Sequence, residues 1–260
     1  MLRLRVLTAA VLIAVLVSAL FWLPRTGWWL FAAAVIGLCA REWGGLVAPA
    51  MRSLYALLLL ALAAGSLWLV TLHPGTGRIW YWAAACYWVL AAPLWIARRP
   101  AGAAWPRLLA GVFVLVPAFL AIVQLRAWGP GTLLGLLGLV WTSDTAAYFV
   151  GSRFGRHKFA PAISPGKTWE GVAGALLASA VYASVWAASS ATLPATGGAF
   201  VALLLVLTVI GIMGDLVESQ LKRIAGVKDS GDLLPGHGGM LDRLDALLAV
   251  LPFAALVFLA

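Results

Sequence analysis

Charged residues are scarce in this chain. Asp, Glu, Lys and Arg together make up 10% of its 260 residues, whereas 63% are hydrophobic. Soluble globular domains usually carry about 25% charged and about 45–50% apolar residues, so this composition excludes an ordinary soluble domain. A helix needs roughly 20 apolar residues to cross a bilayer, and such runs recur along the chain. Because these runs are continuous and do not alternate, they indicate membrane-spanning helices and argue against a transmembrane β-barrel.

Cysteine is nearly absent as well. Cys39 and Cys86 both lie within apolar runs, and their spacing is not that of metal ligands. We interpret them as small side chains that face lipid or other helices. A metal site built on cysteine is therefore not expected.

Acidic residues are missing from almost all of the first half, where Glu42 is the one exception among nine. The other eight are Asp144, Glu170, Asp215, Glu218, Asp229, Asp232, Asp242 and Asp245. No linker and no internal repeat divides the chain. We therefore expect a single membrane domain over residues 1–260, in which 1–130 form mainly hydrophobic scaffold spans and 131–260 form the catalytic half.

The apolar runs predict about nine transmembrane helices, separated by breaks rich in turn residues. We expect these helices at residues 6–23, 28–47, 54–72, 79–97, 108–125, 131–151, 171–189, 199–219 and 242–259. The first run follows two arginines, as in a signal peptide. It is long, however, and no clear cleavage site ends it, so we expect a retained span.

The net charge of +9 is explained better by the positive-inside rule than by a nucleic acid partner. With the N-terminus inside, 15 of the 18 Lys and Arg lie on the inner side and only Arg25, Arg78 and Arg126 on the outer side. Nine spans then leave the C-terminus outside. The predicted fold is an all-α, polytopic membrane bundle, N-in/C-out, which contacts membrane lipids in the cell (inner) membrane and binds no nucleic acid. Assembly as a homodimer is left open.

Carboxylates interrupt the apolar runs at three places in the second half. Asp144 lies within a predicted span, where a charge costs roughly 2.5–3.5 kcal/mol and usually faces a bundle interior or an aqueous cavity. Asp215, Glu218, Ser219 and Lys222 recur at helical spacing and share one face. A position at the membrane interface for Asp144, and a simple ion-pair ladder for the second group, are the alternatives.

Asp242 and Asp245 lie on the first turn of the last predicted helix, where a capping role is the alternative to a site. Asp144, Asp215 and Asp242 all fall at the inner ends of predicted spans. Three carboxylates at one membrane level can bind Mg²⁺ beside substrate phosphates. We therefore predict a metal site formed by these three residues.

Positive charges and glycines surround the predicted acids. The cations are Lys167, Lys222, Arg223, Lys228 and Arg243, with His237 nearby, and the glycines are Gly236, Gly238 and Gly239. Cations and closely approaching backbone amides bind phosphate groups, so the pattern indicates a metal-assisted polyphosphate site at the inner face. The segment GKT at 166–168 is similar to the end of a P-loop, but Pro161 occupies the position of the required first glycine and we expect no preceding strand.

The segment SQLKRIAGVKDSGDLLPGHGGMLDRLD at 219–245 resembles the signature of the phosphatidate cytidylyltransferase (CDP-diacylglycerol synthase) family. The segment SDTAAYFVGSRFGRHKFAPAISPGKTWEG at 143–171 is similar to a second family segment, and REWGGL at 41–46 is weakly similar to an early one. The resemblance implies transfer of cytidylyl from CTP to phosphatidate, with release of pyrophosphate, for phospholipid biosynthesis. It also implies Mg²⁺ as cofactor, with a second cation such as K⁺ as an option, and a site facing the cytosol.

Carried over by motif position, Asp215 and Asp242 are the first metal ligands, with Asp144 beside them. The expected catalytic residues are Asp144, Lys167, Asp215, Lys222 and Asp242. The expected substrate-binding residues are Lys167, Ser219, Lys222, Arg223, Lys228, Asp229, His237, Gly238, Gly239 and Arg243. Two positions depart from the family pattern: Asp232 stands where a neutral polar residue is expected, and Ala246 where serine is expected.

Three alternatives remain at this point. A CTP-dependent lipid kinase would transfer the γ-phosphoryl group to an alcohol, and Asp144 or His237 would then be its base. A synthase of the CDP-archaeol type would keep the reaction and change the lipid. An ion-coupled transporter would use Asp144 and Asp215 as coupling carboxylates, but it would also require polar residues near the midplane and an inverted repeat.

Overall fold

The computed structural model of this chain describes residues 2–98, 102–189, 193–195, 197–234, 236 and 238–259, with residues 2–6 described by their backbone alone. Its helices are α1 (Leu2–Trp22), α2 (Arg25–Val47), α3 (Arg52–Leu72), α4 (Thr76–Cys86), α5 (Ala92–Arg98), α6 (Ala104–Trp128), α7 (Pro130–Phe154), α8 (Trp169–Ser189), α9 (Gly197–Ile224) and α10 (Leu241–Phe258). A single 3₁₀ turn, η1 (Pro49–Met51), precedes α3, and a π-helical stretch, η2 (Tyr87–Ala91), joins α4 to α5.

The helices confirm the predicted all-α membrane bundle. Counting α4, η2 and α5 as one continuous segment, each of the nine expected spans coincides with a helix in the described part of the chain. Seven of these segments are long and apolar enough to cross a membrane, and α1 and α10 are not among them. The helix α10 carries three charged residues at its start, and the part of α1 with described side chains is short. The chain is therefore a multi-pass membrane protein, while the number nine and the N-in/C-out orientation stay predictions.

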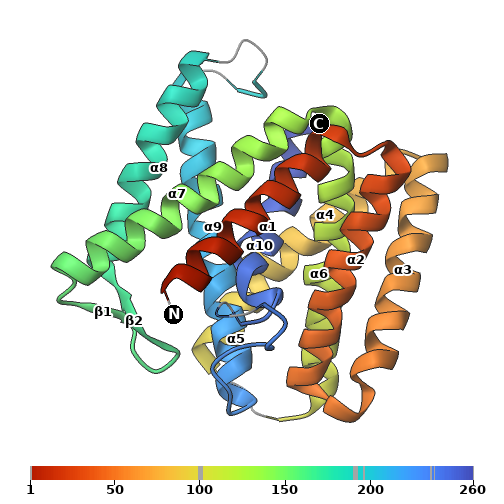
Figure 1. The fold of residues 1–260 in the computed structure, drawn as a ribbon, viewed down its shortest axis with the longest axis horizontal. Helices are drawn as coiled ribbons and strands as arrows, with labels where there is room; N and C mark the ends of the chain where they lie inside the picture. Colours follow the sequence, from red (N-terminus) through yellow and green to blue (C-terminus); the bar gives the residue numbers. More distant parts are fainter. Residues whose placement is uncertain are drawn as a thin grey trace.

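Two helices form the centre of the bundle. In α6 every residue from Ala118 to Ala121 is buried, and in α10 every residue from Ala246 to Leu251 is buried. A helix that is apolar on all sides packs best when other helices surround it. Figure 1 shows α10 in the interior, with the α7–α8 pair along one edge and α2 and α3 along the opposite edge.

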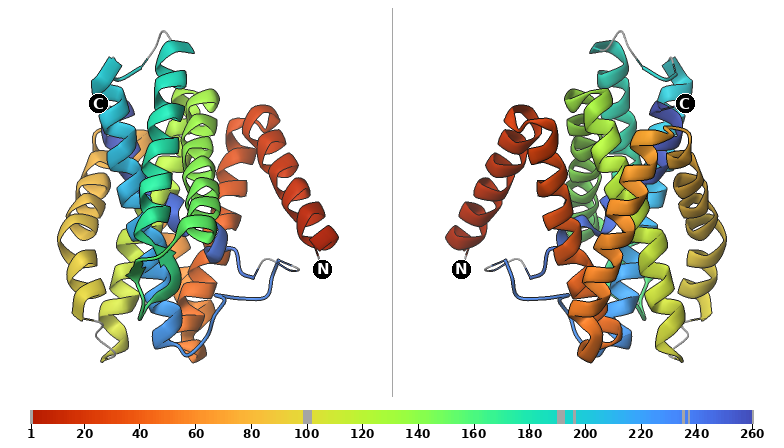
Figure 2. Two further views of the ribbon diagram at one scale, coloured as in Figure 1. Left: turned by 90° about the vertical axis from the view of Figure 1, so that its left-hand side faces the viewer. Right: turned by 90° about the vertical axis from the view of Figure 1, so that its right-hand side faces the viewer.

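The first helix, α1, lies apart from this bundle. Figure 2 shows it leaning away from α2 and joined to the rest mainly near its C-terminal end. Among its described side chains only Ala19 and Leu20 are buried. Its apolar surface therefore faces the surroundings of the bundle over most of its length.

A β-hairpin interrupts the helices between α7 and α8. Strand β1 (Lys158–Ala160) pairs antiparallel with β2 (Ser164–Thr168), with Lys158 opposite Thr168. The expectation of no strand before GKT is wrong. The paired strands are stabilised by the buried Ile163 and by an edge-to-face contact of Phe159 with Trp169, with 4.7 Å between the ring centroids. A short polar stretch of sequence gives no sign of such tertiary contacts. The exclusion of a P-loop rests on Pro161, and Lys167 lies inside a strand.

Close helix packing brings two acidic positions together. A Cβ on Gly214 of α9 would lie 2.6 Å from the carbonyl oxygen of Asp245 and 3.0 Å from the Cβ of Ala249 on α10. Small residues allow such close approach of helices in membranes. The residue after Gly214 is Asp215, so this contact sets Asp215 beside Asp245.

Candidate active site

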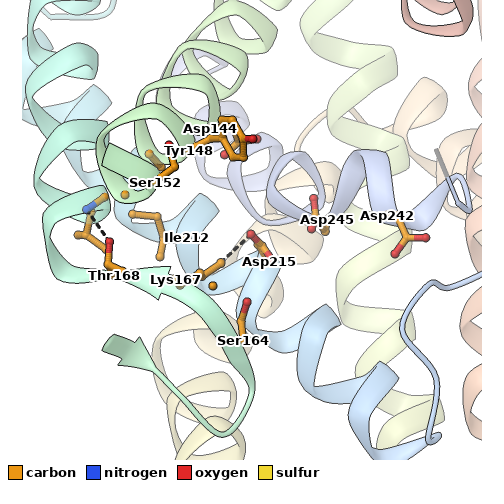
Figure 3. A pocket seen from close by; sticks show the side chains of 15 residues that line it. Asp144, Tyr148, Ser152, Ser164, Lys167, Thr168, Ile212, Asp215, Asp242 and Asp245 are labelled. Atoms are coloured by element: carbon orange, nitrogen blue, oxygen red, sulfur yellow. Dashed lines mark hydrogen bonds and ion pairs between the residues drawn. The ribbon is translucent and has the colours of Figure 1, made fainter. Parts of the chain in front are cut away.

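A cavity of about 470 Å³ opens where α7, β2, α8, α9 and α10 meet. The side chains labelled in Figure 3 come from α7, β2, α9 and α10, and α8 contributes Gly171 and Val172 to the lining. Its charged lining consists of Asp144, Lys167, Asp215, Asp242 and Asp245. The structure therefore brings the three carboxylates predicted as metal ligands, and the predicted Lys167, to one cavity.

The hairpin positions Lys167 over the cavity. Its ammonium nitrogen lies 2.6 Å from Oδ2 of Asp215 in an ion pair (Figure 3). The next residue, Thr168, is buried and its hydroxyl accepts a hydrogen bond from the backbone N–H of Gly171 at 3.1 Å, which caps the start of α8. The strand and the helix start thus hold Lys167 between them.

Three carboxylates face this part of the cavity from three helices: Asp144 from α7, Asp215 from α9 and Asp245 from α10 (Figure 3). Among the described lining residues, Lys167 is the one cation beside them. No three acidic, histidine or cysteine side chains in the described part of the chain already converge as the ligands of one ion. The oxygen donors nevertheless fit a hard divalent cation, because such ions bind through one or two carboxylates together with water and substrate phosphates.

Asp242 lines the same cavity but has other partners. Its Oδ1 accepts from Lys222 Nζ at 2.6 Å, and its Oδ2 accepts from the backbone N–H groups of Ser230 and Gly239, both at 2.8 Å. These are the contacts of a carboxylate on the first turn of a helix that holds the preceding loop against it. Asp242 therefore ties the preceding loop to the first turn of α10, and its role as a metal ligand stays a prediction.

Lys222 is held in a buried ion-pair network. Its ammonium nitrogen lies 2.6 Å from Oε2 of Glu218 as well as 2.6 Å from Asp242, and the Glu218 side chain is 3% exposed. On the same helix, the Ser219 hydroxyl donates to Asp215, four residues before it, at 3.2 Å. The expected polar face therefore divides into a cavity part around Asp215 and a buried pair, Glu218–Lys222, which matches the ion-pair alternative.

The remaining predicted cations lie around the loop that follows α9. Arg223 donates from Nε to the carbonyl oxygen of Ile163 and from Nη1 to that of Val227, both at 3.3 Å, and so ties the hairpin to the end of α9. Lys228 and Asp229 are exposed on the loop, and Arg243 is exposed on the first turn of α10. His237 lies outside the described residues.

The two predicted glycines are required by close contacts. Gly238 has φ +81°, and a Cβ there would lie 2.7 Å from Oδ2 of Asp242. A Cβ on the buried Gly239 would collide with the Ser230 hydroxyl and with the carboxylate of Glu42. Both positions therefore need glycine so that the loop can close on two carboxylates.

Two residues lay outside the predicted site set although the structure brings them to it. Asp245 faces the cavity beside Asp215 (Figure 3). Glu42 belongs to α2 in the first half, yet its carboxylate accepts from the hydroxyl of Ser230 and from the backbone N–H of Met240 and Leu241, at 2.8–2.9 Å. The signal for Glu42 was its isolation, since it is the one acid in a half that is otherwise free of them.

Comparison with known proteins gives matches over the whole chain. Residues 3–260 match the model of the cytidylyltransferase family. A phosphatidate cytidylyltransferase of Pseudomonas aeruginosa is 38% identical, with 100% of this chain and 98% of that protein covered. A protein of the same name from Haemophilus influenzae is 37% identical, with 97% of each chain covered. A further one from Bacillus subtilis is 44% identical over about half of each chain, 52% and 50%.

Proposed function

This chain belongs to the cytidylyltransferase family, and we propose that it transfers the cytidylyl group of CTP to phosphatidate. The products would be CDP-diacylglycerol and pyrophosphate. The observation that carries this proposal is the match over full length to relatives named phosphatidate cytidylyltransferase. The cavity of acids and a lysine, formed mostly by the two segments that resemble the family, supports it.

The reaction needs little proton transfer. A phosphate oxygen of phosphatidate is already anionic, so it can attack the α-phosphorus of CTP without a strong base. The new bond joins this oxygen to the α-phosphorus, and the bond from the α-phosphorus to the pyrophosphate oxygen breaks. What the protein must supply is orientation and compensation of negative charge.

Lys167 is the residue best placed to bind phosphate in the cavity. Its ammonium group is paired with Asp215, at 2.6 Å, and lies among three carboxylates. A bound triphosphate would compete with Asp215 for this ammonium group. We propose that Lys167 orients the phosphates, while Lys228 and Arg243 contribute from the loop and from the first turn of α10.

The carboxylates of the cavity fit Mg²⁺, and we propose that Asp144, Asp215 and Asp245 hold it. When bound, this ion would neutralise the charge of the phosphates and of the departing pyrophosphate. The sequence places Asp242 in this set, but the hydrogen bonds that Asp242 accepts support a role in holding the loop instead. A second cation such as K⁺ stays a prediction.

The apolar part of the cavity lining suits a lipid. Tyr148 and Ala147 of α7, Val172 of α8 and Ile212 of α9 line it together with the acids. Tyr148 is 70% exposed, and Phe149 beside it on α7 is 64% exposed. Apolar surface next to a charged cavity supports a substrate with a phosphate headgroup in the cavity and acyl chains in the bilayer.

We further propose that the protein lies in the inner membrane with this cavity open to the cytosol. The proposal rests on the excess of basic residues on the side of the cavity and on the cytosolic location of a nucleotide substrate. Assembly as a homodimer stays a prediction.

The test uses purified protein in detergent with phosphatidate, Mg²⁺ and CTP labelled at either the α- or the γ-phosphorus. We expect label from the α position in the lipid product and none from the γ position. Parallel reactions offer lipid alcohols such as a polyprenol or diacylglycerol. Label from the γ position in those lipids would replace the proposal with a lipid kinase, and no label in any lipid would leave the transporter as the alternative.

A further inference from the structure

The start of α10 lacks a cap of its own. Helix N-termini leave several backbone N–H groups without partners inside the helix, and a Ser, Thr, Asp or Asn before the helix usually supplies an acceptor. Here the residue before α10 is Met240, which makes no side-chain cap hydrogen bond. The N–H groups of Met240 and Leu241 need an acceptor from elsewhere in the protein.

That acceptor is Glu42, from a helix 198 residues earlier in the chain. Its Oε1 accepts from the N–H of Met240 at 2.9 Å, and its Oε2 accepts from the N–H of Leu241 at 2.8 Å. The Ser230 hydroxyl lies between two carboxylates, 2.8 Å from Oε2 of Glu42 and 3.0 Å from Oδ2 of Asp242. One scaffold carboxylate thus contacts both ends of the loop that runs from Ser230 to α10.

The loop is shaped around this carboxylate. A Cβ on Gly231 would lie 3.0 Å from Oε1 of Glu42, and a Cβ on Gly239 would collide with Oε2. The helix that carries Glu42 is itself anchored to α6, because the buried Trp43 donates from its indole nitrogen to the carbonyl oxygen of Arg107 at 2.9 Å. Glu42 therefore fixes the position of the loop relative to α2 and α6.

We infer that Glu42 is a positioning residue for the cytidylyl transfer proposed above, an inference that rests on that proposed function. By holding the N–H groups of Met240 and Leu241, it sets the start of α10 and with it Asp242 and Asp245. Glu42 itself is absent from the lining of the cavity in the described part of the chain. It acts through the loop and does not contact the reacting groups.

The test compares Glu42→Gln with Asp232→Asn in the full-length protein. Glutamine keeps the length of the side chain but has only one acceptor oxygen. Its NH₂ group would face one of the backbone N–H groups that Glu42 accepts from, and two donors cannot form a hydrogen bond. Asp232 is an exposed acid of the same loop, so Asp232→Asn removes a matched negative charge at a site that makes none of these contacts. Hydrogen–deuterium exchange reports the loop, and transfer of α-label reports kcat and KM for CTP.

For Glu42→Gln we expect exchange about tenfold faster in peptides that cover residues 229–241, the change that loss of a hydrogen bond to a charged acceptor produces. Exchange in α6 and α9 should match the wild type. The value of kcat/KM for CTP should fall about 10–100-fold, which is the usual effect of losing a residue that orients a site. Asp232→Asn should match the wild type in all of these measurements.

Unchanged exchange in the loop, unchanged kcat/KM, or faster exchange throughout the bundle would each overturn the inference. If Glu42→Gln does not yield monodisperse protein, Ser230→Ala is tested in its place, because it removes the shared hydroxyl and keeps both carboxylates. A wild type that transfers no α-label would contradict the proposed function alone, because the exchange data still report whether Glu42 holds the loop.

Discussion

Four aspartates line one cavity, and their neighbours give them different chemistry. Asp215 is paired with Lys167, and Asp242 is engaged by Lys222 and two backbone N–H groups. Asp144 and Asp245 face the same space from helices on either side. A carboxylate whose oxygens already accept several hydrogen bonds has less to offer a cation, so Asp242 and Asp245 should respond differently to substitution.

We predict that Asp245→Asn raises the Mg²⁺ concentration needed for half-maximal activity about 10–100-fold, because it removes a carboxylate that we propose as a metal ligand. Asp242→Asn should abolish turnover at every Mg²⁺ concentration, because the amide disrupts the loop and the pair with Lys222. Titration of Mg²⁺ in the α-label assay measures both, and Asp232→Asn is the control. If Asp242→Asn instead needs more Mg²⁺ but reaches normal turnover at high Mg²⁺, Asp242 would be assigned as a metal ligand.

At Gly238 we predict that alanine impairs both stability and activity. The substitution costs about 1–2 kcal/mol for the left-handed backbone conformation, and its Cβ would also press on Oδ2 of Asp242. The matched control is Gly226→Ala, where φ is +74° and no atom lies within 4 Å of the Cβ. Thermal unfolding in detergent should show a loss for both variants, and activity should fall for Gly238→Ala alone.

At the scale of the elements, helix contacts and one hairpin assemble the site. The approach of α9 to α10 at Gly214 sets Asp215 beside Asp245, and β2 carries Lys167 to the same place. Arg223 ties the hairpin to the end of α9 through the carbonyl oxygen of Ile163. The site therefore depends on how these elements pack, as much as on its charged side chains.

We predict that Gly214→Ala forces α9 and α10 apart, because its Cβ would lie 2.6 Å from a carbonyl oxygen that cannot move independently of α10. Overpacking of this kind costs typically 1–3 kcal/mol. Gly65→Ala in α3 is the control, since it is also helical and no atom lies within 4 Å of its Cβ. Unfolding midpoints and α-label transfer should fall for Gly214→Ala and stay at the wild-type level or above for Gly65→Ala.

At the scale of the whole molecule, helices of the first and second halves pack against one another, and a carboxylate of the first half also contacts the loop before α10. The second half supplies the lining of the cavity, and Glu42 from the first half holds the loop. The division into residues 1–130 and 131–260 stays a prediction. The contact of Glu42 makes the two halves depend on each other at the start of α10.

The predicted orientation can be tested on the intact protein in cells. Single cysteines are introduced at Gly75, between α3 and α4, and at Gly102, between α5 and α6, in a background of Cys39→Ala and Cys86→Ala. At both glycines no atom lies within 4 Å of a Cβ, so the substitutions are tolerated sterically. With N-in/C-out, a membrane-impermeant thiol reagent should label Gly75→Cys in intact cells and Gly102→Cys only after permeabilisation; the reverse pattern would invert the topology.

Much of the fold could be predicted from composition and spacing. Each of the nine predicted spans coincides with a helix, because a long apolar run in a bilayer has few ways to satisfy its backbone other than as a helix. The hairpin at residues 158–168 was missed, because its pairing depends on a buried Ile163 and on the contact of Phe159 with Trp169. Such contacts do not produce a local pattern.

The sequence by itself determined that this is a helical membrane protein with most of its acids in the second half, because apolar length and the clustering of acids are properties of the chain alone. It also determined which residues resemble the family signature. Only the tertiary structure decided which carboxylates share the cavity, that Lys222 forms ion pairs with Glu218 and Asp242, and that Glu42 caps α10. These pairings join residues up to 199 positions apart, and no spacing along a chain can encode which of several acids meets which donor once the helices pack.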